Sequence, residues 1–362
     1  MTKLLSPFSL RQVTLKNRIV ASPMCQYRAT DGHANPWHDT HYAGLARGGV
    51  SLVVVEATAV SKEGRITPGC LGLWEAGQEP GLRRIASLIK EEGAVPGIQL
   101  GHAGRKASIS RPWEGDSHLM EATAGGWDTV APSPLAYGHN LPKVPGELTI
   151  DDIRRVRDDF VAAACRAADT GFEWLELHFA HGFLAQTFFS VRTNKRADRY
   201  GGDFAGRTRF MIETLAAVRE VWPRGLPLTV RFGCQEFDGR DNETASEVLE
   251  LVKQFRIVGV DLLDVSIGFT EYNDRIPWGP GMLVETSRKL KQLVGIPTAV
   301  SWNVEEPELA ASIVELDQAD LIYIAKALLA NPHYPFEIAK ALGVAAPSWV
   351  LPAPYARWLE RY

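Results

Sequence analysis

The sequence contains few cysteines, and none of them are closely spaced. Its 362 residues include four, at Cys25, Cys70, Cys165 and Cys234. Their separation matches neither the paired spacing of a zinc site nor a disulfide framework. We therefore expect no structural metal and no disulfide scaffold, and three of the four cysteines are expected to pack as small apolar side chains. Cys25 is considered separately below.

The sequence also lacks an excess of one charge. Lysine and arginine number 39 and aspartate and glutamate 43, for a net charge of −4, and the basic residues are scattered. Proteins that bind nucleic acid or an anionic membrane concentrate basic residues in one segment or on one face. We therefore expect that the protein binds neither nucleic acid nor a membrane. Its ligand is expected to be a small molecule.

Long apolar runs are missing as well. No stretch reaches the length of a membrane span, and residues 1–10 lack the charged, apolar and cleavage regions of a signal peptide. These absences lead us to expect a cytoplasmic protein.

The sequence does contain a repeated alternation of helix and strand signals. Thr149-x-x-Asp152 precedes apolar residues at helical spacing, which predicts a capped amphipathic helix that ends at Gly171. A short apolar strand follows at once, and the same order recurs along the chain. Helices are predicted near 38–47, 80–91, 207–222 and 243–255 and from about 307. Strands are predicted over 18–21, 52–56, 95–100, 174–178, 228–232, 262–266, 298–300 and 321–325.

Eight strands alternating with helices are typical of a parallel (β/α)8 TIM barrel, here predicted as a single domain spanning 1–362. A doubly wound open sheet is the alternative, but no Gly-x-Gly-x-x-Gly turn follows any predicted strand. The alternating segment 8–15 predicts an N-terminal hairpin across the bottom of the barrel. Residues 102–148, after the third strand, form an unusually long loop, and we expect it to act as a lid or substrate wall.

Chemistry in such barrels lies at the C-terminal ends of the strands. Gln99 and Arg231 end otherwise apolar strands, where an amide and a guanidinium can bond a flat heterocycle. An ion pair inside the barrel or a capped loop is the alternative for each. Cys25, just after the first strand, is by itself a weak signal, because no base accompanies it.

His178 and His181 lie at the end of the 174–178 strand, with a spacing that can aim two imidazoles at one carbonyl or nitro oxygen. A metal pair is the alternative, although no third ligand is evident beyond Glu176, whose direction the sequence leaves open. A phosphate has two candidate sites. Gly104-Arg105-Lys106 is one, and the segments near Asn303 and Lys326, at the usual barrel phosphate position, are favoured.

Taken together, several motifs in this order resemble the old yellow enzyme family, in its xenobiotic reductase branch of bacterial ene-reductases. The match runs nearly end to end. It includes Asn17-Arg18-Ile19, Pro23-Met24-Cys25-Gln26-Tyr27, Glu56-Ala57-Thr58, Gly64-Arg65-Ile66, His102-Ala103-Gly104-Arg105-Lys106, Ala131-Pro132-Ser133, His178-Phe179-Ala180-His181-Gly182, Asn194-Lys195-Arg196, Tyr200-Gly201-Gly202 and Pro354-Tyr355-Ala356-Arg357-Trp358.

The resemblance implies noncovalent FMN, reduced by NADPH or NADH and reoxidised by α,β-unsaturated carbonyl compounds, nitro compounds or quinones. It implies that Cys25 tunes the flavin and that Arg231 faces the electron-rich edge of the reduced ring. The cofactor-binding residues implied are Pro23, Met24, Cys25, Ala57, Gln99, Arg231, Ser301, Trp302, Asn303, Ala325 and Lys326.

On the acceptor side, the resemblance implies that His178 and His181 bond the oxygen of the acceptor. Tyr27 and Trp302 would then shape the substrate pocket. The C-terminal tail, about 345–362, is expected at a subunit interface of a homodimer or higher homo-oligomer, with Trp358 reaching the neighbouring site.

Two departures from the family pattern change these expectations. Phe183 stands where the family has the tyrosine that protonates the α-carbon, and phenylalanine has no proton to donate. We therefore expect slower enone turnover, with the α-proton coming from water or Tyr27. Ala325-Lys326 replaces Gly-Arg at the phosphate, and lysine lacks the bidentate fork of arginine, which predicts weaker FMN retention.

These departures leave three alternatives to an ene-reductase. Reduced flavin could pass hydride out and back, which would make the protein an isomerase. The chain could also be an impaired barrel that only binds flavin or a phenolic ligand. The third is a metal-dependent hydrolase built on His178 and His181.

Overall fold

The strands that alternate with helices close into a barrel in the computed structural model, which describes residues 2–360 and 362. In these residues the barrel has eight strands in the order β10-β11-β12-β3-β4-β5-β8-β9, and every neighbouring pair is parallel. The predicted TIM barrel is thus confirmed. Its strands are β3 (Ile19–Ala21), β4 (Leu52–Ala59), β5 (Val95–Gly101), β8 (Trp174–Phe179), β9 (Leu228–Gln235), β10 (Leu262–Ile267), β11 (Thr298–Val300) and β12 (Leu321–Ile324).

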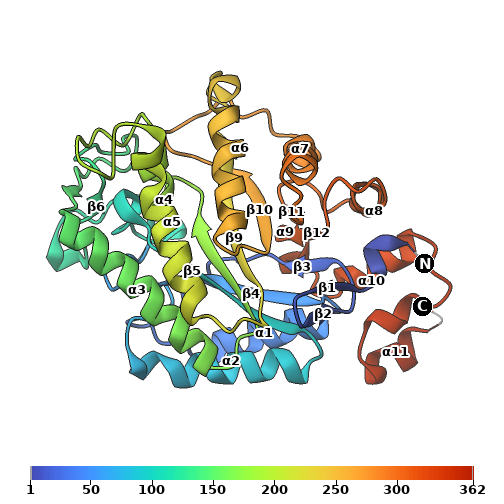
Figure 1. Ribbon diagram of the computed structural model, residues 1–362. Helices are drawn as coiled ribbons and strands as arrows, with labels where there is room; N and C mark the ends of the chain where they lie inside the picture. The colour runs from blue at the N-terminus through green and yellow to red at the C-terminus, as the bar shows by residue number, and fades with distance from the viewer. Residues whose placement is uncertain (1, 361) are drawn as a thin grey trace.

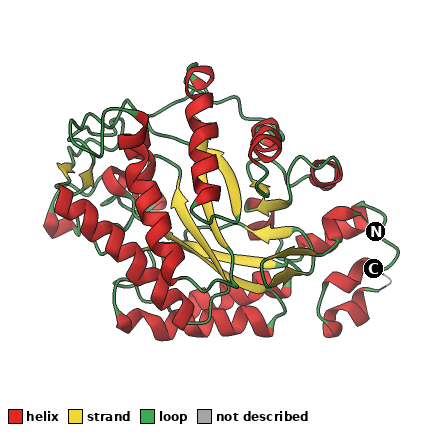
Figure 2. Ribbon diagram, in the orientation of Figure 1, coloured by secondary structure: helices red, strands yellow, loops and turns green. Residues whose placement is uncertain are grey.

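Helices surround this barrel on its outer face (Figures 1 and 2). The longer ones are α1 (Pro36–Arg47), α2 (Glu79–Glu91), α3 (Ile150–Asp169), α5 (Phe204–Val221), α6 (Asp241–Ile257), α7 (Val284–Val294), α8 (Pro307–Glu315) and α10 (Tyr334–Ala341). Shorter helices are α4 (Leu184–Phe189), α9 (Lys326–Ala330) and α11 (Ala353–Leu359).

The start of α3 confirms the predicted capping box. The Thr149 hydroxyl accepts a hydrogen bond from the Asp152 amide at 3.1 Å, and the Asp152 carboxylate accepts one from the Thr149 amide at 3.0 Å. Such a cap contributes about 1 kcal/mol to stability. By contrast, α7 was not predicted, because Leu283 occupies its N-cap and makes no side-chain cap bond.

The N-terminal hairpin closes the bottom of the barrel, as expected. Strands β1 (Phe8–Leu10) and β2 (Val13–Leu15) pair antiparallel. Val13 and Leu15 are buried in one cluster with the inward side chains of the barrel strands, among them Val54 and Trp174. The hairpin therefore seals the barrel core at the end opposite to the strand ends that carry the candidate site.

The predicted long loop also appears, between β5 and α3. It contains only short 3-10 turns and the two-residue strands β6 (Val130–Ala131) and β7 (Gly146–Glu147). In Figure 1 it lies at the upper left, beside α4. Its position beyond the end of β5 makes it a wall of the barrel mouth.

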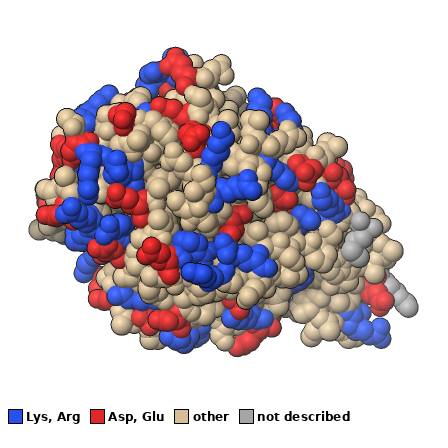
Figure 3. All heavy atoms as spheres, viewed as in Figure 1, with Lys and Arg blue, Asp and Glu red and all other residues tan. Residues whose placement is uncertain are grey.

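Surface charge follows the expectation from composition. On the face drawn in Figure 3, lysine and arginine form several groups, and aspartate and glutamate lie beside and between them. Within the part of the chain that the structure describes, no helix has the length and apolar character needed to span a bilayer.

Candidate active site

The barrel brings the predicted site residues to one rim. Parallel strands of a closed barrel end at the same mouth, so residues about 300 positions apart in sequence become neighbours. Around the mouth lie Pro23, Met24 and Cys25 after β3, Ala57 in β4, Gln99 in β5, His178 in β8, Arg231 in β9, Ser301, Trp302 and Asn303 after β11, and Ala325 and Lys326 after β12.

Several of these residues are partly exposed to solvent, although residues at and inside the barrel strands are usually buried. Pro23, Met24 and Cys25 are each half-buried. Ala57 is the one half-buried residue of β4, and the pairing of β4 with β5 shifts register between Val55 and Ala57. The rim therefore presents a small, largely apolar surface on which a flat ring can lie.

Arg231 lies at the base of this surface, surrounded by polar groups. Its Nη2 donates to the Ser301 hydroxyl at 2.8 Å and its Nη1 to the Ser22 hydroxyl at 3.5 Å. Its Nε lies 3.1 Å from Oδ2 of the fully buried Asp264, without hydrogen-bond geometry. Arg231 is thus a buried guanidinium whose Nε has no hydrogen-bond partner.

Gln99 bonds a second buried carboxyl group. Its amide donates to Glu176 at 2.7 Å, and the Tyr323 hydroxyl donates to the other oxygen of Glu176 at 3.1 Å. Burial raises the pKa of Glu176, and the Arg231 charge opposes that shift. The sequence left open whether Gln99 and Arg231 bond a heterocycle or internal partners, and the structure shows that both have internal partners.

His178 and His181 face each other at the end of β8. Their ring centroids are 4.6 Å apart and nearly perpendicular. His178 Nδ1 accepts from the Ala180 amide at 3.3 Å, and His181 Nε2 lies 2.8 Å from the Ser266 hydroxyl. Burial holds the pKa of each imidazole well below its usual range. Both rings are therefore neutral, and His178 carries its proton on Nε2, where it can be donated.

An aromatic wall encloses His181. Trp302 lies 5.9 Å and Phe269 5.7 Å from its ring, and Trp278 lies 5.4 Å from Trp302, all between centroids. The indole N–H of Trp302 donates to the Ser266 hydroxyl that also contacts His181. On the opposite side, Tyr27 packs against Trp113 of the long loop, with centroids 6.2 Å apart.

Phe183 stands beside this pair of imidazoles. Its ring centroid is 4.8 Å from that of His178. It packs with Cys25, Tyr27 and Ala57 on one apolar cluster. A cavity of about 10 Å³ next to Phe183 is also lined by His102. The ring therefore occupies the site where a proton donor is expected, and Tyr27 is the phenol on the same wall.

The Cys25 thiol is protonated. Burial raises its pKa well above the usual value, while the neighbouring Tyr27 hydroxyl acts weakly in the other direction. A thiol that keeps its proton is a poor nucleophile. Cys25 is therefore suited to contact a cofactor and not to attack a substrate.

The two candidate phosphate sites differ. Arg105 donates to the carbonyls of Leu135 and Ala136 at 3.0 and 3.1 Å, so it holds parts of the long loop together. At the other site, Asn303 and Lys326 are exposed, and Trp302 and Asn303 both have left-handed backbone, with φ of 70° and 55°. Such turns expose backbone N–H groups, which suits an anion.

The donor set at the rim fits FMN. The Arg231 guanidinium, the half-buried apolar surface at Ala57 and the exposed Lys326 correspond to the pyrimidine edge, the ring face and the phosphate of that cofactor. The described residues contain no group of three or more histidine, cysteine, aspartate or glutamate side chains placed for a metal. Glu176 bonds Gln99 and Tyr323 inside the barrel and so offers no third ligand to the histidines.

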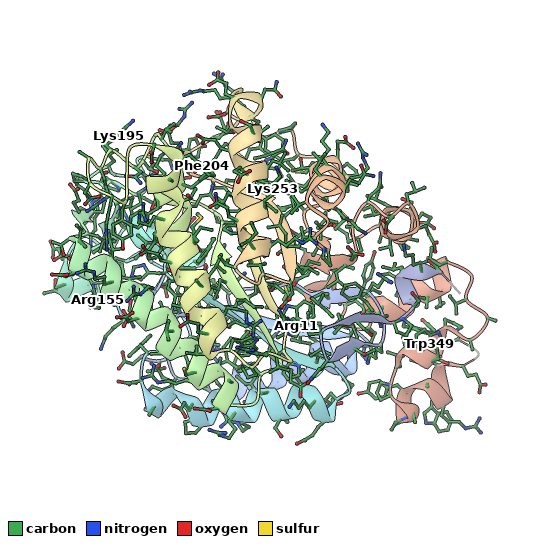
Figure 4. All side chains as sticks on the ribbon, viewed as in Figure 1. Arg11, Arg155, Lys195, Phe204, Lys253 and Trp349 are labelled. Carbon is green, nitrogen blue, oxygen red and sulfur yellow. The ribbon has the colours of Figure 1, made fainter. Side chains whose placement is uncertain are left out.

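Trp358 lies elsewhere. Its side chain is 85% exposed on α11, which packs on the short 3-10 turn Pro347–Val350. Trp349 of the same segment is labelled in Figure 4, at the far side of the molecule from the long loop. The structure does not bring Trp358 to the other site residues of its own chain.

Sequence reasoning missed some residues that complete the site. Ser266 ends a predicted strand but was not singled out, and Asp264 and Tyr323 read as ordinary strand positions. Phe269 and Trp278 lie in an irregular loop with no motif. A polar residue inside an apolar strand was the available signal for Asp264.

A further hollow lies outside the rim. A cavity of about 550 Å³ lies between the segments after β9 and β10, with Glu236, Arg240, Tyr272 and Arg275 in its wall. None of the residues predicted from the sequence lines it. Its wall carries charges of both signs.

Comparisons with known proteins place this arrangement in a family. Residues 3–344 match the NADH:flavin oxidoreductase / NADH oxidase family. An NADPH dehydrogenase of Geobacillus thermodenitrificans is 39% identical over 345 residues, which cover 95% of each chain. An NADPH dehydrogenase of Bacillus velezensis is 37% identical, with 98% of each chain covered.

Solved structures show the same fold. Morphinone reductase in complex with tetrahydroNAD superimposes with a TM-score of 0.77 at 23% identity, covering 98% of this chain and 97% of that one. 2-Naphthoyl-CoA reductase gives 0.84 at 23% identity, and the chain spans 52% of that longer protein. The old yellow enzyme resemblance of the sequence is confirmed by these matches. The chain thus belongs to the NADH:flavin oxidoreductase / NADH oxidase family and is a flavin oxidoreductase that uses a nicotinamide nucleotide.

Proposed function

We propose that the chain binds FMN noncovalently across the barrel mouth and passes hydride from NADPH or NADH to an electron-poor acceptor, as in the xenobiotic reductase branch of the family. The acceptors proposed are α,β-unsaturated carbonyl compounds, nitro compounds and quinones. The pair of neutral imidazoles at 4.6 Å, enclosed by aromatic rings, carries this proposal. When bound, FMN supplies a ring that accepts hydride and releases it from the same face.

On the cofactor side, each residue has a separate task. Pro23, Met24 and Ala57 provide the surface under the ring, and the Cys25 thiol contacts its edge. Arg231 places positive charge at the edge that becomes electron-rich on reduction, where it stabilises that charge. Gln99 orients the same edge through its amide. The phosphate end is assigned to Ser301, Trp302, Asn303, Ala325 and Lys326.

On the acceptor side, His178 and His181 bind the oxygen of the substrate. Each neutral imidazole carries one N–H that it can donate, and burial makes that hydrogen bond stronger than it is in water. Drawing electron density to the oxygen makes the β-carbon of an enone more electrophilic. Trp302 and Tyr27 limit the orientations that the acceptor can take.

Proton delivery is the incomplete part of this site. Phe183 has no acidic hydrogen, so Tyr27 or water must protonate the α-carbon of an alkene. Burial raises the pKa of Tyr27, which makes it a weak acid. Acceptors whose reduction needs no carbon protonation are therefore favoured over enones.

The same substitution supports a second candidate, an isomerase or a flavin-binding protein without turnover. If the α-proton arrives slowly, hydride returned to the flavin from the same carbon would re-form the double bond and could change its E/Z geometry with no net reduction. Consumption of NADPH distinguishes a reductase from an isomerase. A reductase consumes NADPH in every turnover, whereas an isomerase uses it only once, to reduce the flavin.

We further propose that the whole chain functions as one domain and that its tail meets a second copy of the chain. The exposed indole of Trp358 suits a contact with the neighbouring barrel mouth. Sedimentation of the Trp358→Ala variant tests this, since the wild-type chain is expected to be a dimer and the variant to dissociate more readily. A monomeric wild-type protein contradicts it.

The proposed function is tested with the purified protein. It should be yellow, and its flavin should bleach when NADPH or NADH is added anaerobically. Replacing both His178 and His181 by alanine should leave FMN bound but weaken binding of a phenolic ligand by at least 10-fold, because two hydrogen bonds are lost. A colourless protein that takes up no FMN overturns the proposal.

A further inference from the structure

Lys106 lies where three strand-end loops meet. It ends the 3-10 turn Gly104–Lys106 just after β5. Its ammonium donates to the carbonyl of His181 at 2.7 Å and to that of Phe269 at 3.0 Å, and it lies 4.2 Å from the centre of the Tyr137 ring. One side chain thus joins the turn after β8, the turn after β10 and the long loop.

Lys106 satisfies its donors without a carboxylate. Among the described residues it forms no ion pair within 4.0 Å, and Glu236 acts on it only at a distance. The two carbonyls and the aromatic face replace the interactions with water that the ammonium loses on burial. Burial, with Arg105 next to it, lowers the pKa of Lys106 to about 7. Burying a lysine ammonium without such partners costs free energy, so these contacts stabilise the position of Lys106.

The carbonyls that Lys106 binds belong to strained turns. His181 and Phe269 are non-glycine residues with left-handed φ of 61° and 48°, a conformation that costs each about 1 kcal/mol. Gly182, at φ 68°, packs so closely that a Cβ there would collide with the Phe269 carbonyl. These two turns bring the carbonyls of His181 and Phe269 close together. A hydrogen-bond donor between the two carbonyls therefore stabilises both turns.

Each of these turns also supplies a wall of the acceptor site. The His181 imidazole bonds Ser266, and the Phe269 ring lies 5.7 Å from it. A small rotation of either turn would move the His181 imidazole and the Phe269 ring relative to each other. Because Lys106 binds the main chain of both turns, it fixes the positions of the His181 and Phe269 side chains at the site.

We propose that Lys106 is a positioning residue, which fixes the His181 imidazole and the Phe269 ring in the acceptor site by binding the carbonyls of both turns. This inference rests on the proposed function, because it assigns His181 to the acceptor. Arg105 supports the arrangement by donating to the Thr270 carbonyl and to the long loop. The hydrogen bonds of Lys106 are to these two carbonyls, so it acts on the site through the main chain of the turns.

The test compares three variants. Lys106→Met removes the charge and the donors while keeping the length of the side chain, and Lys106→Arg restores the charge and donors. Lys143→Met is the matched control. Lys143 also spans a loop, donating to the Trp127 carbonyl at 2.8 Å and the Ser108 hydroxyl at 3.1 Å, but it contacts neither turn.

The first readout is binding of a phenol to the FMN-loaded protein, followed by the long-wavelength absorption band that a phenolate forms with oxidised flavin. Lys106→Met should weaken binding about 10-fold or more, while FMN affinity stays unchanged, because a charged donor to two carbonyls is lost. Lys106→Arg should recover most of the binding. Equal losses in Lys106→Met and Lys143→Met, or no loss in Lys106→Met, overturn the proposal.

The second readout needs no cofactor. Burial is the main cause of the lowered pKa of His181, and the charges of Arg231 and Lys106 lower it further. NMR titration of the FMN-free protein should therefore show the pKa of His181 rising in Lys106→Met and returning in Lys106→Arg. An unchanged His181 signal overturns the positioning role. If the wild-type protein accepts no hydride, the proposed function fails while this titration still decides the role of Lys106.

Discussion

Arg231 and Asp264 are opposite each other on neighbouring strands β9 and β10, and their Nε and Oδ2 atoms lie 3.1 Å apart in the buried interior. Burial raises the pKa of Asp264, and Arg231 opposes this while Glu176 adds to it. The charge that Arg231 presents to the cofactor therefore depends on whether Asp264 carries a proton.

This relationship predicts the behaviour of Asp264→Asn. An ionised Asp264 offsets Arg231, so its removal should make the flavin easier to reduce by about 1–3 kcal/mol, or about 20–60 mV. The raised pKa means that wild-type Asp264 is neutral at low pH. The difference in midpoint potential between variant and wild type should thus grow as pH rises.

Spectroelectrochemical titration between pH 5 and 9 measures this difference. Asp261→Asn is the control, because Asp261 pairs with Arg11, labelled in Figure 4, at the opposite end of the strands. Equal potentials for wild type and Asp264→Asn throughout that range would contradict the prediction.

Phe183→Tyr should restore a proton donor beside the imidazoles. Enone turnover is expected to rise about 100-fold, the usual contribution of a positioned acid. Flavin reduction by NADPH should not change, and quinone reduction in the same variant serves as the internal control. Stopped-flow traces with both acceptors measure the effect. Unchanged enone turnover together with rapid flavin reduction would show that proton delivery is not limiting.

Lys326→Arg should strengthen FMN binding. Lys326 is exposed at the start of α9, and arginine adds a second donor in a geometry that matches phosphate. We expect a dissociation constant about 3- to 10-fold lower, measured by quenching of FMN fluorescence. Lys289→Arg on α7 controls for the general effect of arginine. Identical constants for wild type and Lys326→Arg would rule out weak phosphate contact as a cause of flavin loss.

Glu56→Gln should change how stability depends on pH. Tyr42 donates to Glu56 at 2.8 Å and the Gln26 amide at 2.9 Å, and burial raises the pKa of Glu56 from 4.5 to about 7. The folded protein thus binds more protons than the unfolded chain between these values, so stability falls as pH rises from about 4.5 and the loss is complete above about 7.

The loss amounts to about 3 kcal/mol for a shift of this size, and Glu56→Gln should abolish it. Urea unfolding at pH 5 and pH 8 measures the difference, with Glu121→Gln on the surface as the control. A variant whose stability changes between these pH values as much as that of the wild type would refute the assignment.

The sequence alone determined the barrel. Eight apolar segments alternate with amphipathic helices, and these local patterns depend on burial and capping, which act over a few residues. The capped start of α3 at Thr149 and the hairpin β1–β2 were predictable for the same reason. The candidates Gln99, Arg231, His178 and His181 followed from their positions at strand ends, combined with a family resemblance that runs along the chain.

Only the tertiary structure decided what those residues contact. Asp264 and Tyr323 look like strand residues until closure of the barrel places them beside Arg231 and Glu176. Lys106 precedes His181 by 75 residues and Phe269 by 163, and no local pattern links them. Local sequence encodes which groups face the barrel mouth, whereas hydrogen bonds between distant loops exist only once the barrel has brought its strand ends to one rim.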